Sequence, residues 1–249
     1  MESMEKVFKE NSDIEVVIHC AALAHNKGDD LSRERFIKIN YDGTKNLVDM
    51  CNKFLKLKSF IFLSTISVYG ERFSISEYRE YETISPKTPY AVSKKLSESY
   101  IRENLKGDYS ILRLASVYSK DFDRNIRKRT EIKGLGYTVG NGFKKVSLCN
   151  IKNIYLVIDY LLKNEDGKNT YNISDKKPYT YRELLIERNK KRVIIIPRFL
   201  MKALYEINKI TFKNLFIEEN SIKLLSDNIY PSDEINKKVD LIYTIKDKE

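Results

Sequence analysis

The sequence contains no tryptophan, only two histidines and only three cysteines among its 249 residues. The cysteines, Cys20, Cys51 and Cys149, lie far apart and show no paired spacing. Structural zinc sites and disulfide frameworks both depend on cysteines or histidines at paired spacings. The composition therefore argues against both, and we expect no metal site.

Long apolar runs are absent as well. The densest run, Val193–Ile196, has the length of a strand, whereas a membrane-spanning helix needs about 20 apolar residues. Residues 1–6 are charged and lack the apolar core of a secretory signal. With 42% hydrophobic and 32% charged residues, the chain has an ordinary globular composition. We expect no membrane span and a cytoplasmic protein.

The formal net charge of +10 is the strongest compositional bias. The basic residues are spread along the chain and mixed with 35 acidic ones, so we predict no nucleic-acid partner. The densest basic run, 124–129, could steer an anionic substrate, although a solvated surface is the preferred interpretation. The segment 198–205 could contact a membrane surface, but we prefer a helix that packs by its amphipathic face.

Apolar patterning predicts strands that alternate with helices. The predicted strands are 15–18, 60–63 and 110–114, and the predicted helices are 32–57 and 89–105. Thr88 and Pro89 supply an N-cap hydroxyl and a proline at the first helical position. Such alternation predicts an α/β fold with a doubly wound parallel sheet. Beyond Lys120 the pattern is less regular, although 180–183 forms a capping box.

Three residues form the most informative pattern of the chain. Tyr90 and Lys94 are four residues apart and share one face of a predicted helix. An ammonium near a phenol favours the phenolate, so we expect Lys94 to lower the pKa of Tyr90 from about 10. That would make Tyr90 a general acid and base. Thr65 ends an apolar strand 25 residues earlier, and open α/β sheets bind ligands at such strand ends.

This constellation resembles the extended short-chain dehydrogenase/reductase family, specifically its nucleotide-sugar epimerases, dehydratases and reductases. The resemblance extends from about residue 5 to about residue 185. The similar segments, in chain order, are His19-Cys20-Ala21-Ala22, Asn40-Tyr41-Asp42-Gly43-Thr44-Lys45-Asn46-Leu47, Ser64-Thr65-Ile66-Ser67-Val68-Tyr69-Gly70, Pro89-Tyr90-Ala91-Val92-Ser93-Lys94, Leu112-Arg113-Leu114-Ala115-Ser116-Val117-Tyr118, Asn150-Ile151-Lys152-Asn153 and Tyr171-Asn172-Ile173-Ser174.

The resemblance implies a Rossmann-like sheet over residues 1–120, which would be a partial NAD-binding and catalytic domain, and a mainly substrate-binding portion over 121–249. It implies NAD or NADP as cofactor and a nucleotide sugar as substrate. Tyr90 would exchange the proton of a substrate hydroxyl, Thr65 would hold the same oxygen, and Lys94 would also position the nicotinamide ribose. The other residues placed near the cofactor are His19, Ala21, Ala22 and Asn40, although for Asn40 we prefer a structural hydrogen-bonding role.

Three departures from the family pattern concern the substrate. Ser116 stands where the family often has a substrate-contacting asparagine. Lys145 adjoins the place of an arginine that clamps the diphosphate, and a lysine lacks the bidentate fork of arginine. Ile66 and Ser67 occupy the positions where the dehydratases carry an acid and a base. These positions favour epimerisation or keto reduction at C4 over 4,6-dehydration.

Relative to the family, the chain has no counterpart for the opening glycine-rich strand–turn–helix, which holds the dinucleotide pyrophosphate. No glycine precedes Gly28, and about 50 residues of the family pattern are missing. The glycine cluster at 134–142 follows a charged stretch, and we predict a mobile loop on the substrate side there. We therefore expect an incomplete cofactor grip and an unpaired sheet edge at 15–18.

The predicted function is an NAD(P)-dependent epimerase or keto-reductase acting at C4 of a UDP-hexose or UDP-hexosamine, in surface polysaccharide biosynthesis. The alternative is a catalytically inactive remnant, or a binding protein, of the same family. The sequence leaves open whether the chain forms a homodimer.

Overall fold

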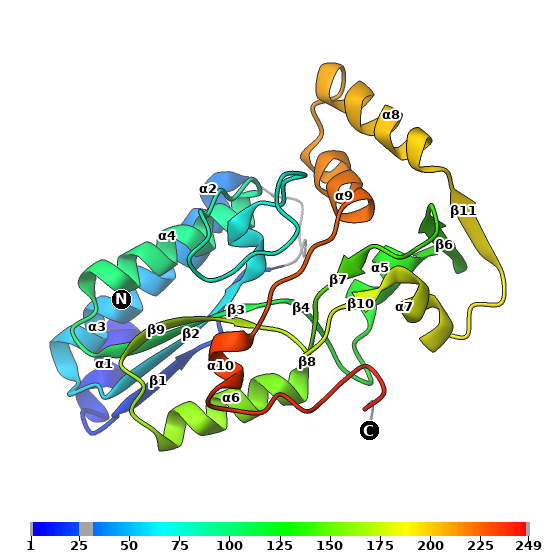
Figure 1. Cartoon of the computed structure of the whole chain (residues 1–249). Coiled ribbons are helices and arrows are strands. Elements are labelled where there is room, and N and C mark those ends of the chain that lie inside the picture. The colour runs from blue at the N-terminus through cyan, green and yellow to red at the C-terminus, as the bar shows by residue number, and fades with distance from the viewer. Residues whose placement is uncertain (1, 25–31, 248–249) are drawn as a thin grey trace. The chain divides into compact units, whose positions relative to one another are not determined.

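The structure is a computed structural model that describes residues 2–24 and 32–247 (Figure 1). The chain forms two units. The first comprises Met1–Gly70, Thr83–Arg113 and Val157–Tyr171, and the second comprises Glu71–Glu82, Leu114–Leu156 and Asn172–Glu249. Across the described residues, no helix is long and apolar enough to cross a membrane.

A four-stranded sheet forms the centre of the first unit, with the order β1-β2-β3-β9. Its strands are β1 (Val16–His19), β2 (Ser59–Thr65), β3 (Asp108–Leu114) and β9 (Lys168–Ile173). Strands β1 and β2 are parallel, with Val16 opposite Ser59 and His19 opposite Phe62. The predicted α/β fold and the predicted strands 15–18, 60–63 and 110–114 are confirmed.

Helices pack against this sheet through a shared apolar core (Figure 1). Phe60 of β2, Ile111 of β3 and Val48 and Ile101 of the adjacent helices are fully buried there. The helices of this unit are α1 (Glu2–Glu10), α2 (Arg33–Phe36), the π-helix η1 (Ile37–Tyr41), α3 (Asp42–Phe54), α4 (Pro89–Asn104) and the later part of α6 (Ile151–Lys163). The predicted helices are thus present, and one of them contains a π-helical turn.

Helix α4 begins as its sequence predicts. The Thr88 side chain accepts a hydrogen bond from the Ala91 N–H, and Pro89 occupies the first turn, where no partner for its missing N–H is needed. This start fixes Tyr90 in the first turn of the helix, and Lys94 lies one turn later.

Strand β1 is an edge of the sheet, because within the described residues it pairs with β2 alone. Ile18 is 40% exposed there, and unpaired apolar edges promote association of chains. We expect the isolated chain to self-associate, and Ile18→Lys to shift it toward monomer in analytical ultracentrifugation. Slow amide exchange at 16–18 in a stable wild-type monomer would contradict this expectation.

The second unit contains several small sheets. Strand β4 (Ser116–Tyr118) pairs in parallel with β8 (Leu148–Asn150), and β7 (Lys145–Val146) pairs antiparallel with β10 (Tyr179–Thr180). A third sheet has the order β11-β6-β5 and consists of β11 (Val193–Ile196), β6 (Leu135–Val139) and β5 (Glu131–Ile132). The helices that lie wholly in this unit are α5 (Arg124–Thr130), α7 (Tyr181–Glu187), α8 (Arg198–Ile210), α9 (Leu215–Leu225) and α10 (Asp233–Asn236).

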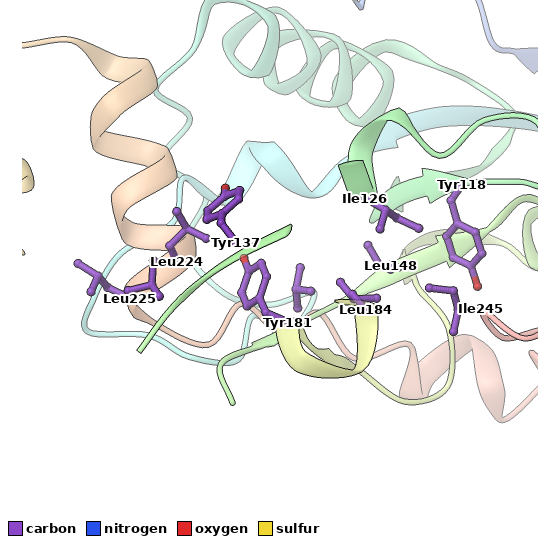
Figure 2. Close-up of a cluster of buried hydrophobic side chains, with 11 residues drawn as sticks. Tyr118, Ile126, Tyr137, Leu148, Tyr181, Leu184, Leu224, Leu225 and Ile245 are labelled. Atoms are coloured by element: carbon purple, nitrogen blue, oxygen red, sulfur yellow. The ribbon is translucent and has the colours of Figure 1, made fainter. Parts of the chain in front are cut away.

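Figure 2 shows the core of this unit, where Tyr118, Ile126, Leu148 and Leu184 lie together in an apolar cluster. Leu148 and Leu184 are fully buried. The predicted capping box opens α7, because Thr180 and Glu183 exchange side-chain and backbone hydrogen bonds.

The glycine cluster at 134–142 is not the loop that we predicted. Residues 135–139 form β6, and Lys133 and Gly134 turn the chain back from β5 with φ angles of +48° and +83°. Two successive positive φ values are typical of a two-residue hairpin turn. The prediction was wrong because β11, the other partner of β6, is supplied by residues 193–196, too far along the sequence to influence a local pattern.

Candidate active site

The end of β2 brings two of the predicted site residues together. Thr65 is the last residue of β2, and its hydroxyl accepts a hydrogen bond from the Ser67 N–H at 3.2 Å. This bond caps the 3-10 helix η2 (Ile66–Tyr69). A side-chain hydrogen bond also joins Thr65 to Tyr90 of α4. The two hydroxyls therefore lie at the carboxyl end of a central strand, where an open α/β sheet binds ligands.

Gly70 is needed to end this strand–turn segment. Its φ is +62°, and a Cβ atom at this position would lie 1.9 Å from the backbone oxygen of Ser85. A side chain would therefore clash with the backbone that returns toward Thr88 and α4. Glycine at this position follows from the close approach of two backbone segments.

Lys94 is 2% exposed and lies one turn after Tyr90. Its Nζ atom lies 4.1 Å from the centre of the Phe62 ring, a favourable cation–π distance. Burial lowers the pKa of Lys94 to about 8, although Glu98 acts to raise it. The ammonium is therefore held in an apolar environment and loses its proton more readily than an exposed lysine.

The pKa of Tyr90 does not move in the predicted direction. Burial raises the pKa of Tyr90 to about 12, and the hydrogen bond with Thr65 offsets only part of that rise. The expectation that Lys94 lowers this pKa was wrong for the protein as it stands, because removing a phenolate from water outweighs the favourable interactions.

A buried ionic network lies beside these residues, and the sequence did not lead us to predict it. Glu98 and Arg113 are 0% and 3% exposed, and their closest nitrogen–oxygen distance is 2.9 Å. Ser64 donates to the Glu98 carboxylate at 2.5 Å, and Arg113 donates to the Tyr69 hydroxyl at 2.8 Å. The signal was available: Glu98 follows Lys94 by one helical turn, and Arg113 interrupts an apolar strand.

With this geometry established, the comparisons with known proteins decide the family. Residues 1–174 match the NAD dependent epimerase/dehydratase family. The chain belongs to this family.

Curated relatives have related but different activities. The chain is 28% identical over 196 residues to a dTDP-D-glucose 4,6-dehydratase of Dictyostelium discoideum, an alignment that covers 69% of this chain and 43% of that protein. It is 35% identical over 115 residues to a putative UDP-glucose 4-epimerase of Methanocaldococcus jannaschii, covering 45% of this chain and 37% of that protein. The chain thus spans less than half the length of these relatives.

Solved structures share the fold. A UDP-glucuronic acid 4-epimerase of Bacillus cereus in complex with NAD is similar with a TM-score of 0.68 at 19% identity, covering 98% of this chain and 72% of that chain. A dTDP-glucose 4,6-dehydratase of Streptomyces venezuelae with bound NAD has a TM-score of 0.66 at 18% identity, covering 96% of this chain and 72% of that chain. At these identities the likeness shows the Rossmann-like fold alone.

Part of the site fits an NAD-type cofactor. Lys94, Tyr90 and the segment after β1 lie on the unit whose sheet the NAD-bound structures share. Among the residues that the structure describes, the glycines offer no phosphate cradle. Their closest spacing, at 134–142, includes the β5–β6 hairpin turn and is not a strand–turn–helix. The residues present therefore suit the nicotinamide and ribose end better than the pyrophosphate.

His19 ends β1 as a buried, neutral residue. Its Nε2 lies 2.9 Å from the Thr44 hydroxyl, which itself lies 2.6 Å from the Asn40 carbonyl oxygen and donates to it. The single hydroxyl proton of Thr44 is thus used, so the His19 Nε2–H must be the donor. Burial lowers the pKa of His19 to about 4, and the nearby Lys94 adds to this effect.

A stability measurement should detect this buried histidine. The folded pKa of about 4 lies below the ordinary 6.5, so the unfolded chain binds more protons between these values. The stability that neutral His19 contributes is therefore fully present above about pH 6.5 and is lost as the pH falls toward 4. We expect the free energy of unfolding in urea to drop by about 2 kcal/mol more between pH 7 and 5 in wild type than in His19→Gln. Glutamine keeps an N–H that can donate to Thr44. If the free energy of unfolding changed equally with pH in both proteins, His19 would not be the buried, neutral residue described here.

Asn40 is buried and makes hydrogen bonds of the structural kind that we expected of it. Its side chain accepts from the Leu23 N–H at 2.7 Å and donates to the Leu23 carbonyl at 3.1 Å and to the Ser93 hydroxyl at 2.9 Å. The amide thereby ties the segment after β1 to α4, and with it Ala21 and Ala22, whose side chains are exposed. Asn40 lies in the π-helical turn η1, a feature frequent at functional sites.

The two predicted substrate residues belong to the second unit. Ser116 begins β4 opposite Leu148 and is half-buried. Lys145 lies on β7 with an exposed side chain, and its backbone N–H donates to Asp227 at 2.9 Å. The structure thus groups Thr65, Tyr90 and Lys94 in one unit and Ser116 and Lys145 in the other.

Proposed function

We propose that this chain is an NAD(P)-dependent epimerase or keto-reductase acting at C4 of a UDP-hexose or UDP-hexosamine. The observation that carries the proposal is the hydrogen bond between Thr65 and Tyr90 at the end of β2, one turn from the buried Lys94. Family membership supports nucleotide-sugar chemistry of this kind. The product would enter surface polysaccharide synthesis in the cytoplasm, where free thiols such as Cys20, Cys51 and Cys149 persist.

Each residue has a distinct role in the proposal. Tyr90 holds or accepts the proton of the substrate hydroxyl, and Thr65 hydrogen-bonds the same oxygen and aligns it with the phenol. When bound, the nicotinamide supplies hydride exchange. Lys94 lies one turn after Tyr90 and contacts the ribose of the bound cofactor. His19, Ala21, Ala22 and Asn40 shape the cofactor side of the site.

The residues after Thr65 favour these reactions over dehydration. Ile66 is buried and has no ionisable group, and Ser67 is a hydroxyl in the same 3-10 helix. Neither can remove a proton from carbon at neutral pH. Epimerisation and keto reduction need a hydride at C4, which a bound nicotinamide would supply, and proton transfer at the C4 oxygen, which Tyr90 and Thr65 can handle.

We propose Ser116 and Lys145 as substrate-binding residues. The division into a catalytic portion at 1–120 and a mainly substrate-binding portion at 121–249 stays a prediction. Whether the chain forms a homodimer also stays open.

A product assay tests the proposed reaction. The 249-residue chain would be incubated with UDP- and dTDP-hexoses and excess NAD(H) or NADP(H), and the products identified by NMR. The expected product is a nucleotide sugar with the opposite configuration at C4, or one in which a 4-keto group has been reduced to a hydroxyl. A 4-keto-6-deoxy product from an unmodified hexose would overturn the choice of reaction.

Cofactor titration separates the enzyme from the alternative, a non-catalytic member of the family. We expect NADH to bind weakly to this chain, because no glycine-rich strand–turn–helix is present in its sequence. Fluorescence or calorimetric titration gives the dissociation constant, and low-micromolar binding would contradict this expectation. Sugar-nucleotide binding without turnover at saturating NADH would identify the chain as a binding protein.

A further inference from the structure

Helix α8 carries an exposed apolar stripe. Leu200, Leu204, Ile207 and Ile210 recur at three- and four-residue steps and are 51%, 40%, 50% and 75% exposed. Residues at such steps share one face of a helix. An amphipathic helix of a globular protein normally turns its apolar face toward the core, so this stripe needs an explanation.

The stripe is separate from the face by which α8 packs. Met201, Tyr205 and Asn208 form that packing face: the Tyr205 ring meets Phe73 edge-on at 5.0 Å, Asn208 donates to the Asn214 carbonyl at 3.0 Å, and the Met201 sulfur accepts from the Ser221 hydroxyl at 3.7 Å. Helix α8 is thus already anchored beside α9 (Figure 1). The preferred interpretation from sequence, a plain packing helix, explains only this face.

Apolar exposure continues on both sides of α8 in the chain. Ile194 and Ile195 of β11 are 49% and 66% exposed, and Phe199, Phe212 and Phe216 are 68%, 67% and 73% exposed. We call these five residues, together with the exposed stripe of α8, the apolar surface. Single exposed apolar side chains are ordinary, whereas these nine exposed apolar residues within 194–216 are more than isolated exposure and indicate an interaction segment.

Basic residues accompany the apolar surface. Residues 190–213 contain seven basic residues and one acidic residue, Glu206. On α8, Arg198, Lys202 and Lys209 follow a stripe of their own and are exposed. The polybasic run 190–192 precedes β11 directly. Apolar side chains on one face of an amphipathic helix and cations on its polar face are typical of segments that lie in a bilayer interface.

We propose that the apolar surface docks the protein onto an anionic lipid bilayer, with α8 lying in the interface and its lysines and arginine contacting lipid phosphates. A second copy of the chain is disfavoured as the occupant, because a symmetric contact would bring two strongly basic surfaces together. Lipid phosphates instead supply the complementary charge. The proposal is independent of the proposed catalytic activity.

Vesicle flotation tests the proposal with the full chain. The two probes are vesicles of phosphatidylcholine and vesicles in which part of that lipid is replaced by phosphatidylglycerol. Wild type should bind the anionic vesicles and release them at high salt. Ile207→Glu should lower the partition coefficient about tenfold or more, and Lys202→Gln, which removes one positive charge, about fivefold. Ile242→Glu makes the same chemical change at a site that is 58% exposed outside the apolar surface, and should bind like wild type.

Circular dichroism would confirm that each variant is folded, as expected for exposed positions. Absence of vesicle binding by wild type, or equal losses in Ile207→Glu and Ile242→Glu, would overturn the proposal. So would a lipid-free dimer in analytical ultracentrifugation that Ile207→Glu dissociates, because the apolar surface would then join two copies of the chain.

Discussion

Replacing Tyr90 by phenylalanine should lower turnover of a nucleotide sugar about 10²- to 10⁴-fold, the usual contribution of a general acid or base. The substitution removes only the phenolic oxygen, and the ring keeps its edge contact with Phe36, at a centroid distance of 6.3 Å. Substrate and cofactor binding should therefore change little. The measurement compares kcat under saturating cofactor with the dissociation constant from calorimetry.

Lys94→Ala provides the contrasting variant. It removes a buried cation that, in the proposal, contacts the ribose and thereby positions the nicotinamide beside Tyr90. The dissociation constant of the cofactor should therefore rise and kcat should fall. Because the pKa of Lys94 is about 8, cofactor binding by wild type should also weaken above pH 8, where the ammonium loses its proton. A Tyr90→Phe enzyme that kept most of its activity would refute the acid–base assignment.

Local spacing was enough to predict the arrangement of Thr65, Tyr90 and Lys94. Strand β2 is apolar along its length and ends at Thr65, and α4 has an unambiguous start at Thr88 and Pro89. These signals lie within a few residues of the side chains that they position. The sequence pattern therefore placed the hydroxyl at a strand end and the tyrosine and lysine on successive turns of one helix.

Burial could not be predicted in the same way, because it depends on segments distant in the chain. The pKa of Tyr90 rises because its side chain is removed from water, and the Y-x-x-x-K spacing carries no information about that burial. Residues 135–139 form a strand only because β11 pairs with them. Likewise the amphipathic pattern of α8 is equally compatible with a packed and an exposed face, and the contacts of Tyr205 and Asn208 decide which face is packed.

The largest stability effect should come from breaking the buried pair of Glu98 and Arg113. Glu98→Ala leaves the Arg113 guanidinium buried beside the Tyr69 ring without its carboxylate, and such losses cost about 3–5 kcal/mol. Glu103→Ala, at an exposed position of the same helix, is the matched control and should change the free energy of unfolding by less than about 0.5 kcal/mol. Urea denaturation followed by circular dichroism measures both.

A double variant separates the attraction of the pair from the cost of burying a lone charge. Glu98→Leu with Arg113→Met removes both charges at similar volume, and should be destabilised by less than either single variant, because replacing a whole buried pair is often nearly neutral. Although burial alone would raise the pKa of Glu98, Arg113 holds it below its ordinary value. The contribution of the pair is therefore present above about pH 4.5 and lost as the pH falls. Additive losses in the double variant would show that Glu98 and Arg113 do not stabilise the fold as a pair.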